Sequence, residues 1–150
     1  MQAQEQLKKY QDELKNLSLS EKLKWALKTF GANKLVLASS LGVEDQLLTK
    51  EIIELDAKAR VFTLDTGRMF QENYLTIDAT TEKYDFKFEI CFPETEEVIH
   101  LLQTKGASSF YNSIEDRKEC CRIRKIAPLR KKLATADCWM TGLRASQSVT

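Results

Sequence analysis

The chain has 150 residues, of which 43% are hydrophobic and 30% charged, and its formal net charge is +1. These values fit one globular domain and are too balanced for a chain that coats nucleic acid. No apolar run approaches the roughly 20 residues of a membrane span, and the polar residues 1–11 lack the apolar core of a signal peptide. We therefore exclude the membrane, secreted and disordered classes and expect a cytoplasmic protein with reduced cysteines.

Two helices are predicted at the N-terminus, within residues 1–31. Leucine and tyrosine recur every three or four residues over 2–17, which is the spacing of one helical face. A second helix is predicted over 20–30, with Ser20 as its N-cap and Gly31 as its end.

From residue 32 onward, short apolar runs alternate with helical spacing. Strands are predicted at 34–39, 60–64, 87–92 and 138–141. Helices are predicted at 43–55, 70–83, 93–105 and 114–133, and Pro128 is expected to kink or split the last of them. This alternation is typical of an α/β fold, here a doubly wound, mostly parallel sheet with helices on both faces. We expect a single domain over 1–150, with its core at 32–150.

Parallel sheets bind ligands beyond the carboxyl ends of their strands, so the turns after the strands form the candidate site. The first turn, Ser39–Gln46, has small hydroxyl residues and leads into a helix whose N–H groups favour a phosphate or sulfate. The second, Leu64–Arg68, holds a carboxylate, a hydroxyl, a glycine and a guanidinium. The third, Trp139–Ser148, again places an arginine shortly after Thr-Gly. An ordinary capped turn or an exposed ion pair is the alternative for each alone; together they favour one anionic, nucleotide-like ligand.

A basic segment lies at residues 117–132, where eight Lys or Arg accompany one acid. Its net charge of +7 leaves −6 for the rest of the chain. It indicates either an anion-binding feature or a solvated helical face. Cys120 and Cys121 lie within this segment, where thiolates would be stabilised. Cys91 and Cys138 fall in predicted strands and are interpreted as small buried hydrophobic residues.

Taken together, four segments resemble the thioredoxin-dependent adenylylsulfate (APS) and phosphoadenylylsulfate (PAPS) reductases of sulfate assimilation. They are Ser39–Gln46, Leu64–Arg68, Lys118–Lys125 with Pro128–Arg130, and Trp139–Ser148. The resemblance covers about residues 33–150. It implies the adenine nucleotide alpha-hydrolase-like (PP-loop) fold and the reduction of APS to sulfite and AMP.

The resemblance also implies which residues contact the substrate. Those carried over as substrate-binding are Ser39, Gly42, Glu44, Asp45, Leu64, Thr66, Gly67, Arg68, Gly142 and Arg144. Lys125 corresponds to the family lysine between an iron–sulfur cluster and the substrate, a supporting role. Leu41 stands where many relatives have a second serine.

Family members with the tandem cysteines use them as two of the four ligands of a [4Fe–4S] cluster, and a distant Cys-x-x-Cys supplies the other two. Cys120 and Cys121 are therefore the metal ligands that the resemblance implies, and the pair favours APS over PAPS. The basic segment would balance the negative charge of the cluster. A vicinal disulfide or two inert thiols are the alternatives.

The implied mechanism begins when a cysteine thiolate attacks the sulfur of APS, which expels AMP and leaves an S-sulfocysteine. Thioredoxin then releases sulfite. In the family this nucleophile and the Cys-x-x-Cys lie beyond the position of Thr150. We therefore expect a fragment that binds nucleotide without turnover, and the same resemblance implies a homo-oligomer.

Three other functions compete with APS reduction. The nearest is PAPS reduction, or use of both substrates. An ATP pyrophosphatase-type adenylating enzyme would share the fold but needs a fuller glycine-rich loop and has no use for Cys120 and Cys121. A nucleic-acid-binding module would use the basic segment, but few aromatic residues lie near it for base stacking.

Overall fold

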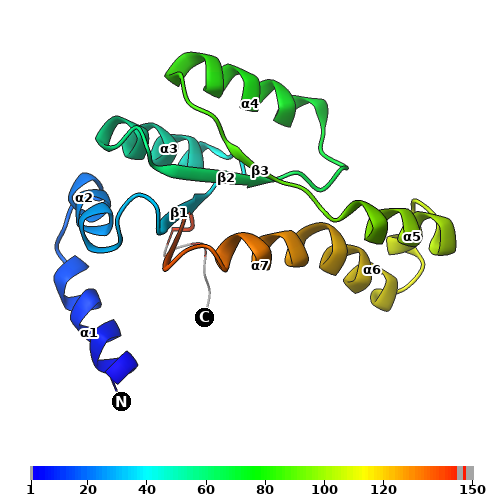
Figure 1. Ribbon diagram of the computed structural model, residues 1–150, viewed down its shortest axis with the longest axis horizontal. Helices are drawn as coiled ribbons and strands as arrows, with labels where there is room; N and C mark the ends of the chain where they lie inside the picture. The colour runs from blue at the N-terminus through cyan, green and yellow to red at the C-terminus, as the bar shows by residue number, and fades with distance from the viewer. Residues whose placement is uncertain (1, 145–146, 148–150) are drawn as a thin grey trace.

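The computed structural model describes residues 2–144 and 147, and Figure 1 shows how their elements are arranged. The helices are α1 (Gln2–Leu14), α2 (Leu19–Phe30), α3 (Val43–Leu55), α4 (Gln71–Tyr84), α5 (Thr95–Lys105), α6 (Ile114–Cys121) and α7 (Ala127–Leu133). A 3-10 turn, η1 (Ser109–Tyr111), precedes α6, and a π-helical segment, η2 (Arg122–Ile126), joins α6 to α7. The strands are β1 (Leu35–Ala38), β2 (Arg60–Leu64), β3 (Glu89–Cys91) and β4 (Cys138–Thr141).

The strands form one all-parallel sheet in the order β3–β2–β1–β4. This confirms the predicted α/β class with a parallel sheet. The chain builds outward from β1 through β2 to β3 and then returns to place β4 on the other side of β1. The strand order therefore reverses between β1 and β4, and such a reversal opens a ligand-binding crevice at the carboxyl ends of the strands.

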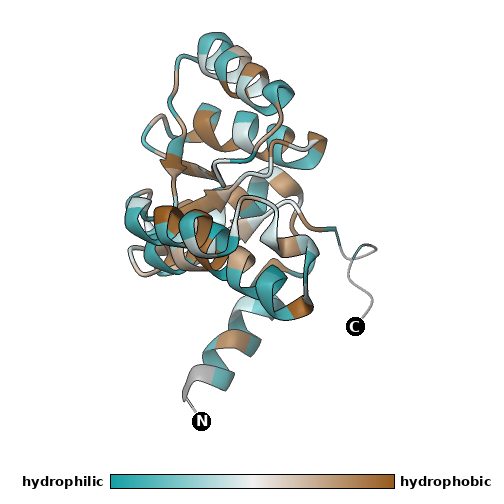
Figure 2. Ribbon diagram, turned by 90° about the vertical axis from the view of Figure 1, so that its right-hand side faces the viewer, coloured by the Kyte–Doolittle hydropathy of each residue, from teal (hydrophilic) through white to brown (hydrophobic). Residues whose placement is uncertain are grey.

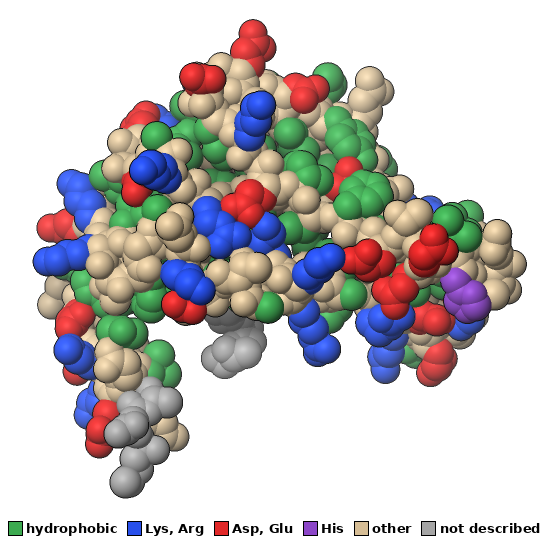
Figure 3. Space-filling view, viewed as in Figure 1, with side chains coloured by type: hydrophobic (Ala, Val, Ile, Leu, Met, Phe, Trp, Pro, Cys, Tyr) green, Lys and Arg blue, Asp and Glu red, His purple; other side chains and the backbone are tan. Residues whose placement is uncertain are grey.

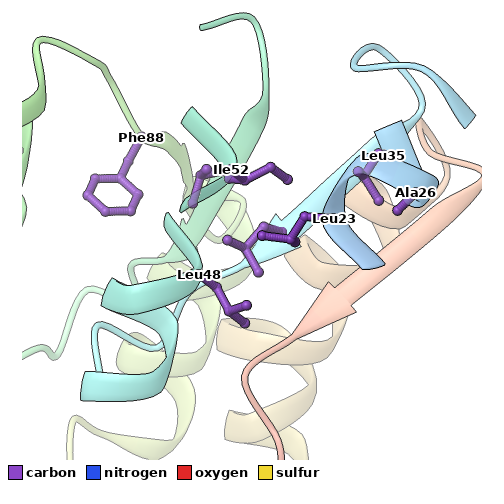
Figure 4. Packing of buried hydrophobic residues seen from close by; sticks show 8 residues of the cluster. Leu23, Ala26, Leu35, Leu48, Ile52 and Phe88 are labelled. Carbon is purple, nitrogen blue, oxygen red and sulfur yellow. The ribbon is translucent and has the colours of Figure 1, made fainter. Parts of the chain in front are cut away.

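Helices cover both faces of the sheet, because successive strand residues point to opposite sides. On one face Leu35 and Leu37 pack with residues of α2 and α3, as Figure 4 shows. The members of this cluster are Leu23, Ala26, Leu35, Leu37, Leu48, Ile52, Val61 and Phe88. On the other face Val36 and Phe62 pack against Leu129 of α7. Figure 2 shows the resulting layering, with apolar strands at the centre and polar helix surfaces outside.

The first helix lies apart from the sheet and contacts α2 (Figure 1). Tyr10 meets Trp25 and Phe30 edge-on, with ring centroids 5.0 and 5.9 Å away. The indole N–H of Trp25 donates to Glu13 at 2.8 Å. Within the part of the chain that the structure describes, every helix is too short or too polar to cross a membrane.

Three predicted boundaries need correction. The first helix ends at Leu14 and does not reach residue 17. The N-cap of α2 is Ser18, not Ser20, because the Ser18 side chain accepts the N–H of Glu21 while the Glu21 carboxylate accepts the N–H of Ser18. This reciprocal pair is a capping box, which Ser20 has no partner to form. Strand β3 is also shorter than the predicted 87–92, since only residues 89–91 pair with β2. The predicted helix at 43–55 and the strands at 60–64 and 138–141 are confirmed.

Pro128 changes the geometry of the helix before it without interrupting the helical path. Its ring lacks an N–H and would clash with the carbonyl of Arg124, four residues earlier. The chain widens into η2 instead, where the Ala127 N–H bonds to the carbonyl of Arg122, five residues back. Such π-turns occur mostly as local insertions within α-helices. The predicted helix 114–133 is therefore split into α6, η2 and α7 along one continuous path.

Candidate functional site

A cavity of about 590 Å³ opens at the carboxyl ends of β1, β2 and β4. All three predicted turns line it, together with the basic segment. The predicted site residues on its wall are Ser39, Glu44, Asp45, Leu64, Thr66, Arg68, Lys125 and Gly142. Apolar residues complete the wall, including Phe62, Leu129 and Trp139. The structure thus brings together segments that lie up to about a hundred residues apart in the sequence.

Asp45 joins the first turn to the third. One of its carboxylate oxygens accepts the N–H and the hydroxyl of Ser40, at 2.7 and 2.6 Å. The other accepts the N–H of Gly142 at 3.0 Å. Asp45 is only 6% exposed. Asp45 lines the cavity, and both of its carboxylate oxygens are engaged in positioning the two turns.

The first turn has a strained backbone. Leu41 has a φ of 66°, a left-handed conformation that a leucine rarely adopts. Its N–H donates to the Ser39 hydroxyl at 3.1 Å, which holds the turn in place. Gly42 then begins α3 without a side-chain cap. The first N–H groups of α3 therefore have no acceptor within the helix, and they carry the positive end of its dipole.

Glu44 and Arg144 form an ion pair of 2.9 Å beside the cavity. Glu44 lines the wall, whereas Arg144 is exposed and its backbone N–H donates to Gln147 at 2.9 Å. Residues 145–146 and 148–150 of the third motif lie outside the described residues. Arg144 pairs with Glu44 in this structure, and its contact with a ligand stays a prediction.

The second turn is held by Asp65, which is buried and accepts the N–H of Gly67 at 2.7 Å. Gly67 has a φ of 68°, in the left-handed region that favours glycine. A hydrogen bond to Asp65 also raises the pKa of the Tyr74 phenol above its usual value. Asp65, a candidate for sugar hydroxyls by its position, is therefore used to shape the turn.

Arg68 lies on the cavity wall but is tied to the segment before α6. Its guanidinium donates to the carbonyl of Ala107 at 2.6 Å and stands 4.7 Å from the ring centre of Phe110. Two or more of its N–H groups remain for an anion, since a guanidinium has five.

Arg124 is a residue of this region that sequence reasoning missed. It is 6% exposed, and its Nη1 donates to the carbonyl of Thr66 at 2.7 Å. The signal in the sequence is its place four residues before Pro128, which is also buried on this helical path. Charged residues are seldom fully buried, so the pattern alone favours exposure.

The cysteine pair lies at the end of α6, just before the segment that supplies Lys125 to the cavity. Both thiols are free and partly buried. The contact of Arg124 with Thr66 places this helical path on the same side of the molecule as the Gly67 turn. At Cys91 and Cys138, burial raises the pKa of the thiol above its usual value.

Part of the basic segment is already neutralised inside the fold. Arg122 pairs with Glu97 at 3.1 Å, Lys131 pairs with Glu94 at 2.7 Å, and Lys132 pairs with Glu89. Figure 3 shows basic and acidic side chains intermingled over α5 and α6. The segment is therefore less cationic toward a ligand than its net charge of +7 suggests.

A four-thiolate metal site is not complete in this part of the chain. Within residues 2–144 and 147, no group of three or more His, Cys, Asp or Glu side chains could hold a metal ion. Cys91 and Cys138 belong to clusters on opposite faces of the sheet, away from the end of α6. The role of Cys120 and Cys121 as two ligands of a cluster stays a prediction, and the described residues do not form a complete cluster site.

The fold and the cavity define a class: an α/β domain with a nucleotide-sized cavity at the switch point of a parallel sheet. The chain belongs to the family described as phosphoadenosine phosphosulfate reductase domain, which matches residues 34–150. This confirms the resemblance found in the sequence.

Named relatives agree with this membership. An adenosine 5'-phosphosulfate reductase of Burkholderia cepacia is 41% identical over 118 residues, which are 79% of this chain and 47% of the relative. One of Rhizobium meliloti is 39% identical over 137 residues, or 91% of this chain and 51% of the relative. The chloroplastic 5'-adenylylsulfate reductase 1 of Arabidopsis thaliana is 40% identical over 135 residues, 90% of this chain and 28% of that protein. The chain spans about half the length of the bacterial relatives it matches.

Proposed function

We propose that this chain is the nucleotide-binding part of an enzyme that reduces APS to sulfite and AMP in sulfate assimilation. Its relatives bear the name of that activity. The observation that carries the proposal is the convergence of three turns and Lys125 on one cavity. Each turn alone has an ordinary explanation. The cavity that the turns share has a volume of about 590 Å³, which is the size of a small-molecule site.

The anionic end of the substrate would lie at the start of α3. The N–H groups after Gly42 have no acceptor within the helix and favour a phosphate. The Asp45 carboxylate would act here as a positioning group, because it fixes Ser40 and Gly142 around that point. Glu44 would face sugar hydroxyls, after release from Arg144 or together with it.

The adenine ring would occupy the apolar part of the wall, between Phe62, Leu64 and Trp139. Lys125 would reach the sulfonate, since it is the basic segment's only predicted site residue on the wall. An ammonium beside the sulfonate stabilises negative charge at the leaving phosphate and on the transferred group.

The reaction would proceed by sulfur transfer. A cysteine thiolate attacks the sulfur of APS, an S–S bond forms, the S–O bond to AMP breaks, and AMP leaves with the electron pair of that bond. A thiol of thioredoxin then attacks the cysteine sulfur, which releases sulfite and leaves a mixed disulfide. The second thiol of thioredoxin attacks this mixed disulfide, frees the enzyme cysteine and forms the thioredoxin disulfide. Cys91 and Cys138 are poor nucleophiles because burial raises their pKa, so the attacking cysteine would come from a part of the protein outside this chain.

Cys120 and Cys121 would hold two irons of a [4Fe–4S] cluster, with two ligands from elsewhere in the protein. When bound, such a cluster would supply an anionic group within the basic segment 117–132. We further propose a cytoplasmic location, on the basis of the free thiols, and assembly into a homo-oligomer.

Calorimetry with AMP, APS and PAPS tests the proposal on this chain, and turnover tests it on the full-length protein. We expect saturable binding of AMP and APS, and sulfite production from APS with thioredoxin. Faster turnover of PAPS would move the assignment to PAPS reduction. Release of AMP from ATP would instead support an adenylating enzyme, and absence of binding to all three nucleotides in the full-length protein would refute the proposal.

A further inference from the structure

Two arginines attach the turn after β2 to the helical path that carries the cysteine pair. Arg124 reaches from η2 and donates to the carbonyl of Thr66 at 2.7 Å. Arg68 reaches in the opposite direction and donates to the carbonyl of Ala107 at 2.6 Å. The turn is thus linked both to the segment before α6 and to the segment after it.

Arg124 is the less replaceable of the two, because it is buried. Its Nε lies buried with no hydrogen-bond partner in the described part of the chain, and none of the ion pairs found there includes Arg124. A buried charge without a counter-ion is costly. The hydrogen bond to the Thr66 carbonyl is therefore the contact that holds the buried guanidinium in place.

Gly67 is shaped to receive this side chain. A Cβ at residue 67 would lie 3.2 Å from Nη1 of Arg124 and 3.6 Å from the ring of Phe92. The glycine therefore provides both the left-handed backbone, with a φ of 68°, and the space for the guanidinium. Arg124 and the Gly67 turn are complementary in shape as well as in hydrogen bonding.

The position of Arg124 in the chain gives this contact its consequence. It follows Cys121 by three residues and immediately precedes Lys125, which lines the cavity. Fixing the guanidinium on Thr66 fixes the backbone from which Lys125 enters the site. It also holds the end of α6 at a set distance from the turn that lines the nucleotide end of the cavity.

We propose that Arg124 is a positioning residue that couples nucleotide binding at the second turn to the environment of Cys120 and Cys121. This rests on the proposed function in one respect, namely that AMP occupies the cavity. When AMP binds and fixes the turn, the hydrogen bond between Arg124 and the Thr66 carbonyl also fixes the helical path that carries the cysteine pair. Without the link, the two parts of the site respond independently.

Thiol labelling with and without AMP tests this coupling on the 150-residue chain. Lys118 and Arg122 flank the pair, so trypsin releases both cysteines in one peptide, residues 119–122, whose alkylation is measured by mass spectrometry. In the unmodified chain, saturating AMP should slow labelling of this peptide by about threefold or more. In Arg124→Gln, AMP should still bind at higher concentration, but saturation should leave the labelling rate unchanged.

Two further variants and a control make the result specific. Arg124→Lys keeps a donor for the Thr66 carbonyl and should restore part of the protection, a rescue that a general loss of stability does not explain. Gly67→Ala disturbs the same contact from the side of the turn, and it replaces Arg124→Gln in the experiment if that variant does not fold. Arg130→Gln removes an exposed charge of the same segment and should retain the protection of the unmodified chain.

The outcomes separate this inference from the proposed function. Equal protection by AMP in Arg124→Gln and in the unmodified chain would overturn the role of Arg124, as would AMP binding to the unmodified chain with no change in labelling. Failure of AMP, APS and PAPS to bind the full-length protein would instead refute the proposed function.

Discussion

The carboxylate of Asp45 accepts the backbone N–H of Gly142 at 3.0 Å, across 97 positions of the sequence. A Cβ at residue 142 would lie 2.2 Å from the same carboxylate oxygen, a separation that real side chains do not tolerate. The two residues are therefore matched: the aspartate joins the turns after β1 and β4, and the glycine leaves it room. This contact closes the cavity on the side where the strand order reverses.

Gly142→Ala should separate the two turns. We expect a loss of about 1–3 kcal/mol in the free energy of unfolding, because Asp45 would be left buried with an unmade hydrogen bond. AMP affinity should fall as well. Urea unfolding and calorimetry measure the two effects. Gly42→Ala is the matched control for stability, since its Cβ would meet only the Ser40 hydroxyl at 3.5 Å; equal stability loss in both variants would contradict this account.

Lys125→Gln should weaken APS binding by about tenfold or more, because a charge-assisted contact with the sulfonate would be lost. AMP, which has no sulfonate, should be affected much less. Calorimetry with both ligands gives the comparison. Lys118→Gln removes an exposed charge on α6 that does not line the cavity and should change neither affinity. An equal effect of Lys125→Gln on APS and AMP would place the lysine elsewhere.

Acid should destabilise the fold partly through Glu89. Contacts with Arg60 and Lys132 lower the pKa of Glu89 from 4.5 to about 2. The free energy that this carboxylate contributes is therefore present above pH 4.5 and is lost as pH falls from 4.5 through 2. Glu89→Gln should lower stability by about 1–2 kcal/mol at pH 6, after allowance for solvent screening of the partly exposed group.

The difference between the unmodified chain and Glu89→Gln should shrink as pH falls below 4.5. Urea unfolding at pH 6, 4 and 3 measures this difference. Glu54→Gln, which breaks an exposed pair with Lys50, should cost less than about 0.5 kcal/mol. A difference for Glu89→Gln that stays constant from pH 6 to 3 would show that the ion pair does not act as described.

Lys105 should hold the cysteine helix against α5. It pairs with Asp116 at 2.7 Å and Glu119 at 2.5 Å, both on α6. Lys105→Met should change global stability by less than about 1 kcal/mol, because the pairs are exposed, but it should speed amide hydrogen exchange over residues 114–121. The control is Lys131→Met, which breaks the ion pair between Lys131 of α7 and Glu94, the N-cap residue of α5. Unchanged exchange in α6 would indicate that packing alone holds the helix.

Much of the fold follows from local patterns in the sequence. The strands 60–64 and 138–141 and the helix 43–55 have the predicted bounds, because apolar runs there end at polar or glycine-containing turns. The N-cap of α2 was predictable too, since Glu21 follows Ser18 by three residues. The short β3 was not, because its ends depend on the residues of β2 that are available for pairing.

The site was predictable as a set of turns but not as a set of contacts. Three polar turns at strand ends must meet at one edge of a parallel sheet, and Ser39, Thr66 and Gly142 line the same cavity there. The burial of Arg124 depends on a backbone carbonyl 58 positions away. The pairing of Arg144 with Glu44 likewise arises from tertiary structure. Neither the burial of Arg124 nor the pairing of Arg144 can be predicted from the local sequence.

Backbone amide chemical shifts during titration with AMP test the central claim most directly. Our account predicts saturable shifts gathered in residues 39–44, 64–68 and 139–143, with little change in α1 or in the Glu89 ion pairs. A titration whose shifts gather instead over the exposed basic surface of α7, and leave those three turns unchanged, would contradict it.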